Sequence, residues 1–247
     1  MERTDKQVRS LVVIPTYNEI ENISSLLAAV FESSKTVHPS LEVLVVDDNS
    51  PDGTGIEVEK LIQVDRFTGR LHLLKRPGKS GLGRAYLAGF QWALDRNYDR
   101  IVEMDADFSH RPVDLMRIIT ALDQADFVIG SRYVTGGSTV NWGVSRKLIS
   151  RGGSLYSRWI LGFPLRDWTG GFNGWNAKVL RGIYLDRVKS EGYSFQIELK
   201  YRALRFGFRG IEVPILFEDR RVGLSKMSSK IVFEAFGRVW SLRLADL

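Results

Sequence analysis

Three short apolar runs in the first half of the chain each end in polar side chains. Residues 15–19 follow the run 12–14, Asp47 and Asp48 follow 44–46, and Asp105 and Asp107 follow 101–104. Short runs rich in Val and Ile are typical of buried strands. In an open α/β sheet the carboxyl ends of parallel strands border one crevice, where ligands bind. The sequence therefore predicts that these polar groups share one ligand site.

Helical periodicity separates the apolar runs. Further strand-like segments lie at 71–74 and 127–129, and helical segments at 23–31, 56–64 and 85–94. This alternation predicts βαβ units and an α/β fold with a mainly parallel sheet flanked by helices. The alternation ends near residue 130. Beyond it we expect an amphipathic helix at 146–161, one strand at 211–217 and a basic, aromatic helix from 228 onward.

Length and composition exclude several classes of protein. The 247 residues suit one large domain, and we expect that domain at 1–225 with an amphipathic helical flank at 226–247. No apolar window approaches the ~18 residues that a membrane-spanning helix needs. The first nine residues are polar and charged, which predicts no secretory signal. The absence of cysteine excludes disulfides and thiolate zinc sites and fits a reducing compartment.

The pair Asp105 and Asp107 has the chemistry of a magnesium or manganese site. Two carboxylates beside a diphosphate suit these ions, because substrate phosphates supply the remaining oxygen ligands. The alternative is a chance pair that caps the helix expected at Pro112. Asp47 and Asp48 end a strand-like run. They therefore suit hydrogen bonds to ribose hydroxyls and a base better than a calcium-binding EF-hand loop, which must be flanked by helices.

Basic residues outnumber acidic ones by 35 to 29, so the chain attracts phosphates. The candidates for phosphate binding are Arg132, Arg146, Arg220 and Lys226, with Lys79 in a glycine-rich turn before a helix. Guanidinium groups match phosphate oxygens in pairs. The alternative for each is a solvated surface charge. No Ser-His-Asp or Cys-His arrangement is evident.

Together these segments resemble the family 2 glycosyltransferases of GT-A fold, and most strongly the polyprenol (dolichol) phosphate mannose synthases. The motifs that carry the resemblance are residues 15–19, 47–54, 81–83, 105–107, 130–133, 146–147, 167–172 and 220–226. The resemblance implies a catalytic domain at 1–225 that transfers mannose from GDP-mannose to a polyprenyl monophosphate. The product would be β-mannosyl phosphoryl polyprenol, formed with inversion.

The resemblance also implies roles for individual residues. The guanosine would be held by Pro15, Tyr17, Glu19, Val45 and Asp47. The sugar and metal would be managed by Asp105 and Asp107, with the backbone of Ala106. The donor phosphates would be bound by Arg132, Arg220 and Lys226, and the lipid phosphate by Arg132 and Arg146. Ser109 stands where the family often has a Gln metal ligand, and because its hydroxyl is shorter it would bind Mg²⁺ or Mn²⁺ directly or through water.

A lipid acceptor implies a peripheral enzyme on the cytoplasmic face of a membrane. The helix at 146–161 has the composition to lie at an interface, as does the C-terminal helix, although both could instead pack on the sheet. An anchoring partner or a further C-terminal anchor fits the same expectation. One alternative is a related transferase that uses UDP-glucose or a sugar hydroxyl. The other is a noncatalytic RNA- or nucleotide-binding module, but the collected carboxylates would repel nucleic acid, so we expect no nucleic-acid partner.

Overall fold

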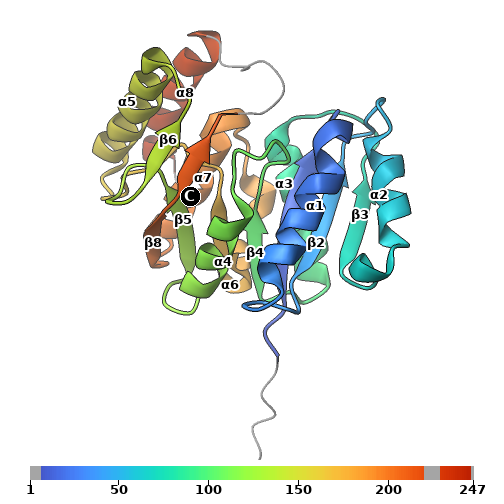
Figure 1. Cartoon of the computed structure of the whole chain (residues 1–247). Coiled ribbons are helices and arrows are strands. Elements are labelled where there is room, and N and C mark those ends of the chain that lie inside the picture. Colours follow the sequence, from blue (N-terminus) through green and yellow to red (C-terminus); the bar gives the residue numbers. More distant parts are fainter. Residues whose placement is uncertain (1–6, 220–228, 246–247) are drawn as a thin grey trace, which may run out of the picture.

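The computed structural model of the chain describes residues 7–219 and 229–245 (Figure 1). Its centre is a seven-stranded sheet in the order β3-β2-β1-β4-β7-β5-β8, in which only β7 is antiparallel to its neighbours. The strands are β1 (Ser10–Thr16), β2 (Glu42–Asp47), β3 (Leu71–Lys75), β4 (Arg100–Glu103), β5 (Phe127–Ser131), β7 (Asn173–Asn176) and β8 (Gly210–Pro214). The predicted α/β fold with a mainly parallel sheet is confirmed.

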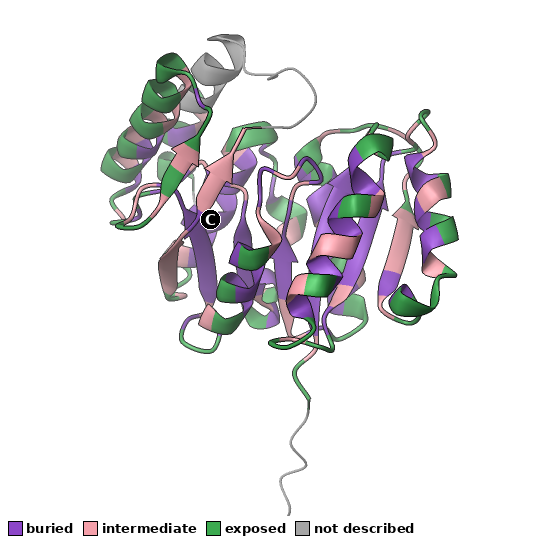
Figure 2. Cartoon of the chain, in the orientation of Figure 1, coloured by how far each residue is buried: buried purple, intermediate pink, exposed green. Residues whose placement is uncertain are grey.

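Helices cover both faces of the sheet. The elements are α1 (Ile20–Ser34), α2 (Thr54–Ile62), α3 (Leu82–Asp95), α4 (Pro112–Ala121), α6 (Ala177–Gly182) and α7 (Gly192–Arg205). Alternate residues of β1 point to opposite sides, so Val12 packs with α1, α2 and α4, whereas Val13 packs with α3, α6 and α7. The strands at the centre are buried throughout, as Figure 2 shows. Burial on both faces explains their continuous apolar runs.

The strand order brings the predicted polar ends together. β1 lies between β2 and β4 and is parallel to both. Its register places Thr16 beside Asp47 and Val13 beside Glu103. The loops after all three strands therefore leave the sheet at the same edge, which is the upper edge in Figure 1.

The prediction of a single strand at 211–217 is wrong in one respect, because this segment forms two strands, β8 and β9 (Leu216–Glu218). β8 pairs with β5 and ends at Pro214, and β9 pairs instead with β6 (Ser138–Val140) in a small second sheet. The chain changes partner at Ile215, whose N–H still donates to the carbonyl of Ser131. A proline cannot donate to a ladder, which favours a break at this position.

Two amphipathic helices lie beside the small sheet, α5 (Val144–Leu161) and α8 (Ser229–Leu244). Val239 and Leu242 of α8 are buried in the same apolar cluster as Leu161 of α5 and the core residues of α7. The division of the chain at 225 stays a prediction. In the ranges that the structure describes, no helix is long and apolar enough to cross a bilayer.

Candidate active site

The loops after β1, β2 and β4 share an unusual backbone feature. Each contains a residue other than glycine with a positive φ: Asn18 at 63°, Asn49 at 57° and Phe108 at 63°. Asn tolerates this left-handed region, but a bulky residue such as Phe rarely adopts it. Strain of this kind persists where the surrounding structure fixes it, and it clusters at functional sites. Three such loops at one sheet edge mark that edge as the candidate site.

Asp47 fixes the loop after β2. Its Oδ1 accepts hydrogen bonds from the hydroxyls of Thr16 (2.9 Å) and Ser50 (2.5 Å), and its Oδ2 accepts one from the N–H of Ser50 (3.0 Å). Gly55 lies against this carboxylate, so closely that a Cβ there would be 2.9 Å from Oδ2. The neighbouring Asp48 accepts a 2.5 Å hydrogen bond from Arg76. Both carboxylates thus shape the loop, and contact of Asp47 with a guanosine stays a prediction.

The other expected nucleoside contacts lie around the same edge. The ammonium of Lys79, which is exposed, is 4.0 Å from the centroid of the half-buried Tyr17 ring, so these two residues form a cation–π pair. Glu19 accepts a hydrogen bond from Asn22 in the first turn of α1. Pro15 and Val45 are buried, and Val45 belongs to the apolar core. Their contacts with a nucleotide stay predictions.

The acidic motif after β4 is a tight turn. Asp105 accepts a 2.9 Å hydrogen bond from the hydroxyl of Tyr86, and its N–H donates to Nδ1 of His110. Asp107 accepts a hydrogen bond from the N–H of Ser109 at 3.0 Å. Burial and the charge of Asp105 raise the pKa of Tyr86 well above its ordinary value, so this hydroxyl remains a donor at neutral pH. Tyr86, on α3, therefore holds the Asp105 carboxylate from one side.

The donor set of this turn fits a metal ion that also binds substrate phosphates. Asp105 and Asp107 supply carboxylates, with Ala106 buried between them. The hydroxyl oxygen of Ser109 is buried and makes no hydrogen bond within the described structure. That part of the chain holds no cluster of three or more His, Cys, Asp or Glu that could bind a metal alone. Such a set suits Mg²⁺ or Mn²⁺, which commonly bind through one or two carboxylates and substrate phosphates.

Arg132, directly after β5, is buried and forms a two-point ion pair with Asp167. Its Nε and Nη2 donate to the Asp167 carboxylate at 2.7 and 2.6 Å, and Nη2 also donates to Thr169 at 2.8 Å. Burial is the largest influence and would raise the pKa of Asp167, but the charge and hydrogen bonds of Arg132, together with the charge of Lys200, hold that pKa below its usual value. The Asp167 carboxylate is therefore ionised at neutral pH.

Arg146, in the first turn of α5, lies near Arg132 on the indole ring of Trp142. The guanidinium carbons of Arg146 and Arg132 are 4.2 and 5.3 Å from that ring's centroid. Arg146 also pairs with Asp219 at 2.5 Å. The structure thus brings together the two predicted lipid-phosphate residues around Trp142. Sequence reasoning had not singled out that aromatic residue.

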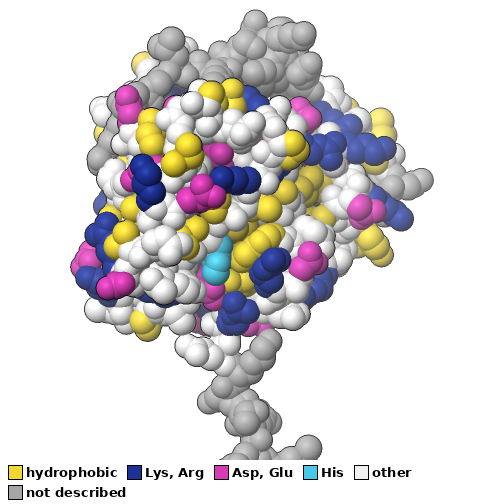
Figure 3. Space-filling model, turned by 90° about the vertical axis from the view of Figure 1, so that its right-hand side faces the viewer, with side chains coloured by type: hydrophobic (Ala, Val, Ile, Leu, Met, Phe, Trp, Pro, Cys, Tyr) yellow, Lys and Arg dark blue, Asp and Glu magenta, His cyan; other side chains and the backbone are white. Residues whose placement is uncertain are grey.

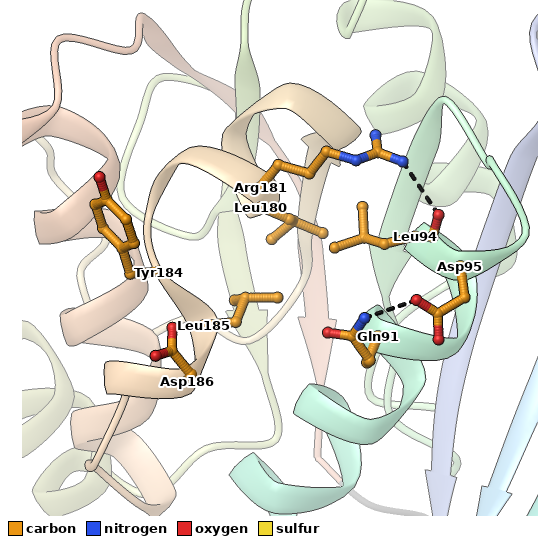
Figure 4. Close-up of a pocket in the computed structure, with 8 residues that line it drawn as sticks. All are labelled: Gln91, Leu94, Asp95, Leu180, Arg181, Tyr184, Leu185 and Asp186. Carbon is orange, nitrogen blue, oxygen red and sulfur yellow. Dashed lines mark hydrogen bonds between the residues drawn. The ribbon is translucent and has the colours of Figure 1, made fainter.

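Two predicted phosphate-binding residues, Arg220 and Lys226, lie outside the described residues. The pocket in Figure 4 belongs to a different region. Its volume is about 320 Å³, and it lies between the last turn of α3 and residues 180–186, which include Arg181 and Tyr184. The last turn of α3 leads into the start of β4, so this pocket is at the opposite edge of the sheet from the carboxylates.

Comparisons with known proteins agree with the geometry. A family model described as Glycosyl transferase family 2 matches residues 11–183. An undecaprenyl-phosphate mannosyltransferase from Micrococcus luteus is 49% identical over 237 residues, which is 95% of each chain. A polyprenol monophosphomannose synthase from Mycolicibacterium smegmatis is 47% identical over 95% of this chain and 88% of its own.

Solved structures extend the similarity of fold. Glucosyl-3-phosphoglycerate synthase from Mycobacterium tuberculosis, in complex with Mn²⁺, UDP-glucose and phosphoglyceric acid, matches with a TM-score of 0.68 and 18% identity. The match covers 96% of this chain and 80% of that one. The same enzyme with Mg²⁺ and UDP matches with a TM-score of 0.66 and 17% identity, over 96% of this chain and 79% of that one. At these identities the likeness concerns the fold alone.

Proposed function

The chain belongs to glycosyl transferase family 2, and on that premise we propose that it transfers mannose from GDP-mannose to a polyprenyl monophosphate. The product would be β-mannosyl phosphoryl polyprenol, formed with inversion at the anomeric carbon. The observation that carries the proposal is the similarity, at 47–49% identity along nearly the whole chain, to two enzymes named for mannosyl transfer to this class of lipid. The buried Arg132 and the nearby Arg146 supply the positive charge that a lipid phosphate requires.

The acceptor explains why no general base is evident among the described residues of the site. A phosphate monoester is already anionic at neutral pH, so it needs no proton removed before it attacks. His110, the one histidine beside the acidic turn, uses Nδ1 to accept the Asp105 N–H, and its ring stacks on Phe172 with centroids 4.4 Å apart. Its part is structural. The work of the site is to bring two anions together, and Arg132 and Arg146 offset their repulsion.

A divalent metal ion fits the same scheme. The structural relatives in complex with Mn²⁺ or Mg²⁺ support this proposal for the present chain. Asp105 and Asp107 would bind the ion through their carboxylates. The Ser109 hydroxyl would be a third protein ligand, either directly or through a water molecule. When bound, such an ion neutralises charge that grows on the diphosphate leaving group.

The proposed nucleotide predicts a difference between GDP and UDP in thermal unfolding. GDP with Mg²⁺ at a hundred times its dissociation constant should stabilise the protein by about 2.7 kcal/mol. For a chain of this size that corresponds to a rise in melting temperature of roughly 5–10 °C. UDP at the same concentration should raise it far less, and EDTA should remove most of the GDP effect. A larger shift with UDP would favour the related UDP-sugar transferase.

Transfer itself is tested by incubation with GDP-mannose and a short polyprenyl phosphate. Mass spectrometry of the lipid should show the gain of one hexose, and UDP-glucose should give none. Lipid that gains hexose only from UDP-glucose would overturn the choice of donor.

The outer side of α5 supports peripheral binding to a membrane. Val144, Leu148, Leu155 and Trp159 form one stripe there and are 74%, 67%, 67% and 85% exposed. Lys147, Arg151 and Arg158 run beside that stripe. The buried side of the helix, with Ser154, Ser157 and Leu161, faces the rest of the protein. Figure 2 shows that much of α5 is exposed. Exposed apolar residues beside basic ones are typical of helices that lie in an anionic bilayer surface.

Vesicle flotation tests this surface. The double substitution Leu155→Ser and Trp159→Ser should reduce binding to vesicles of phosphatidylglycerol and phosphatidylcholine about tenfold or more, since each buried apolar side chain contributes roughly 1.5–3 kcal/mol. The matched control is Ile56→Ser on α2, which removes a side chain that is 59% exposed. Equal binding of both variants would contradict the assignment.

The alternative of an RNA-binding module has less support. On the face shown in Figure 3, Lys and Arg side chains are interspersed with Asp and Glu. RNA binding predicts a basic stripe. The carboxylates at the sheet edge would also repel a nucleic acid.

A further inference from the structure

One buried ammonium holds the turn that carries the partners of Arg132. Nζ of Lys200, on α7, donates to the carbonyl oxygens of Asp167 (3.2 Å), Trp168 (3.1 Å) and Gly170 (2.7 Å). The Lys200 side chain is fully buried. An ammonium has three N–H donors, so this set of carbonyls uses all of them. The backbone from 167 to 170 is thereby gathered around a single charge.

The same turn orients Arg132 with its side chains. The Asp167 carboxylate accepts from the N–H, Nε and Nη2 of Arg132, and the Thr169 hydroxyl accepts from Nη2. Asp167 also accepts the N–H of Gly170 at 2.9 Å, which closes the turn on itself. The carbonyls of the turn therefore face Lys200, while its side chains hold the guanidinium.

A second link joins the turn to the acidic motif. The amide nitrogen of Asn173 donates to the carbonyl of Gly170 at 3.2 Å and to Oε1 of Gln196 at 2.7 Å. It also lies 3.4 Å from Glu103, two residues before Asp105 on β4. Gly170 is thus tied both to Lys200 and to the strand that delivers the carboxylates.

Keeping a lysine here costs free energy that an apolar side chain would not. Burial lowers the pKa of Lys200 to about 8, even though Asp167 and Glu103 act in the opposite direction. The group is still charged at neutral pH and keeps its three donors. A packed apolar residue in such a place is often neutral or stabilising. The charged Lys200 therefore does not serve the stability of the core. It serves to hold the three carbonyl groups of the turn by hydrogen bonds.

We infer that Lys200 is a positioning residue, which fixes the 167–170 turn and through it the direction of the Arg132 guanidinium toward the substrate phosphates. The direction of Arg132 toward substrate phosphates rests on the proposed function. The claim that Lys200 fixes the 167–170 turn does not depend on it.

Hydrogen exchange of the two amides that donate to Asp167 tests the hold directly. In Lys200→Met, the amides of Arg132 and Gly170 should exchange about tenfold faster or more, since the substitution removes hydrogen bonds from a charged donor. Amides of β2 and α3 should keep their rates. The matched control is Lys178→Met on α6, which removes an exposed lysine paired with Asp126 and should leave Arg132 and Gly170 unchanged.

Turnover tests the consequence. Lys200→Met should lower kcat about tenfold or more while the KM for GDP-mannose changes less than about threefold, because the expected nucleoside contacts lie in the loops after β1 and β2 and not in this turn. Lys200→Gln, which keeps two donors, should fall between wild type and Lys200→Met in both assays.

The inference fails if exchange at Arg132 and Gly170 is the same in Lys200→Met and Lys178→Met. It also fails if neither Lys200 variant folds, since Lys200 would then serve folding alone. If the wild-type protein transfers no mannose, the proposed function falls, and the exchange measurement still decides whether Lys200 fixes the turn.

Discussion

Replacing Asp107 with Ala should lower kcat about a thousandfold, the largest loss that we expect from any single substitution at the acidic turn. The carboxylate is the central protein ligand of the proposed metal site, and removal of one preorganised electrostatic group of this kind costs roughly 10²–10³ in rate. Asp107 is only 6% exposed and accepts the N–H of Ser109. Circular dichroism with a thermal melt should therefore accompany the assay, to separate a loss of turnover from a loss of fold.

The matched control is Asp95→Ala, which removes an exposed carboxylate at the opposite edge of the sheet. This variant should keep wild-type turnover. Asp107→Asn separates charge from shape, since it keeps the size of the side chain and loses the anion. If Asp107→Ala kept a tenth of the wild-type rate, Asp107 would not be the metal ligand proposed here.

The central strands were predictable because burial on two faces leaves a signal in composition. β1 and β2 contain continuous runs of Val, Leu and Ile, and the polar residues at their carboxyl ends mark where each strand ends. β7 has no such run, since its sequence is Asn-Gly-Trp-Asn. It fits at the sheet centre because Gly174 leaves room for Ile118, where a Cβ would approach to 2.7 Å. This reason is visible only in three dimensions.

α7 was missed for a related reason. Glu198, Lys200 and Arg202 are charged yet buried, so the helix shows little of the apolar periodicity on which recognition depends. Their partners lie on other elements or a helical turn away, such as the carbonyls of the 167–170 turn for Lys200. Buried charges that are satisfied by distant backbone groups leave no local pattern in the sequence.

The acidic part of the candidate site could be predicted from the sequence, whereas the surroundings of Arg132 could not. The carboxylates were predictable as a group because each lies at the end of a strand or within a few residues beyond it, and parallel strands end at the same edge of a sheet. The surroundings of Arg132 were not, since Asp167 lies 35 positions away and Trp142 contributes only through its ring. The motif resemblance named Arg132 and Arg146 as phosphate ligands, but it did not explain why they lie close together. In the structure both guanidinium groups lie against the ring of Trp142.

Replacing Asp167 with Asn should destabilise the protein by about 3–5 kcal/mol, because it leaves the Arg132 charge buried without an anion. The melting temperature should fall by roughly 10 °C for a chain of this size. Asn also replaces one carboxylate oxygen by an N–H₂ group, which cannot accept the hydrogen bonds that Arg132 and Gly170 donate to Asp167. The loss of hydrogen bonds therefore adds to the loss of charge. Urea unfolding at pH 7 measures the effect.

The dependence on pH checks that the cause is the ion pair. Because the pKa of Asp167 is held below its ordinary value in the folded protein, its contribution is complete above the unfolded pKa near 4 and is lost as the pH falls through the folded pKa. The difference between wild type and Asp167→Asn should therefore be largest at neutral pH and shrink below pH 4. A difference that stayed constant down to pH 3 would point to packing.

A paired substitution separates stability from function at this position. Arg132→Met with Asp167→Leu removes both charges at once, and replacing a whole buried ion pair by apolar residues is often neutral or stabilising. The double variant should therefore regain much of the stability that Asp167→Asn loses. It should still transfer no mannose, because the guanidinium proposed to bind the acceptor phosphate is gone. Full activity in a stable double variant would show that the phosphates bind elsewhere, and recovery of neither property would show that the pair is needed for folding itself.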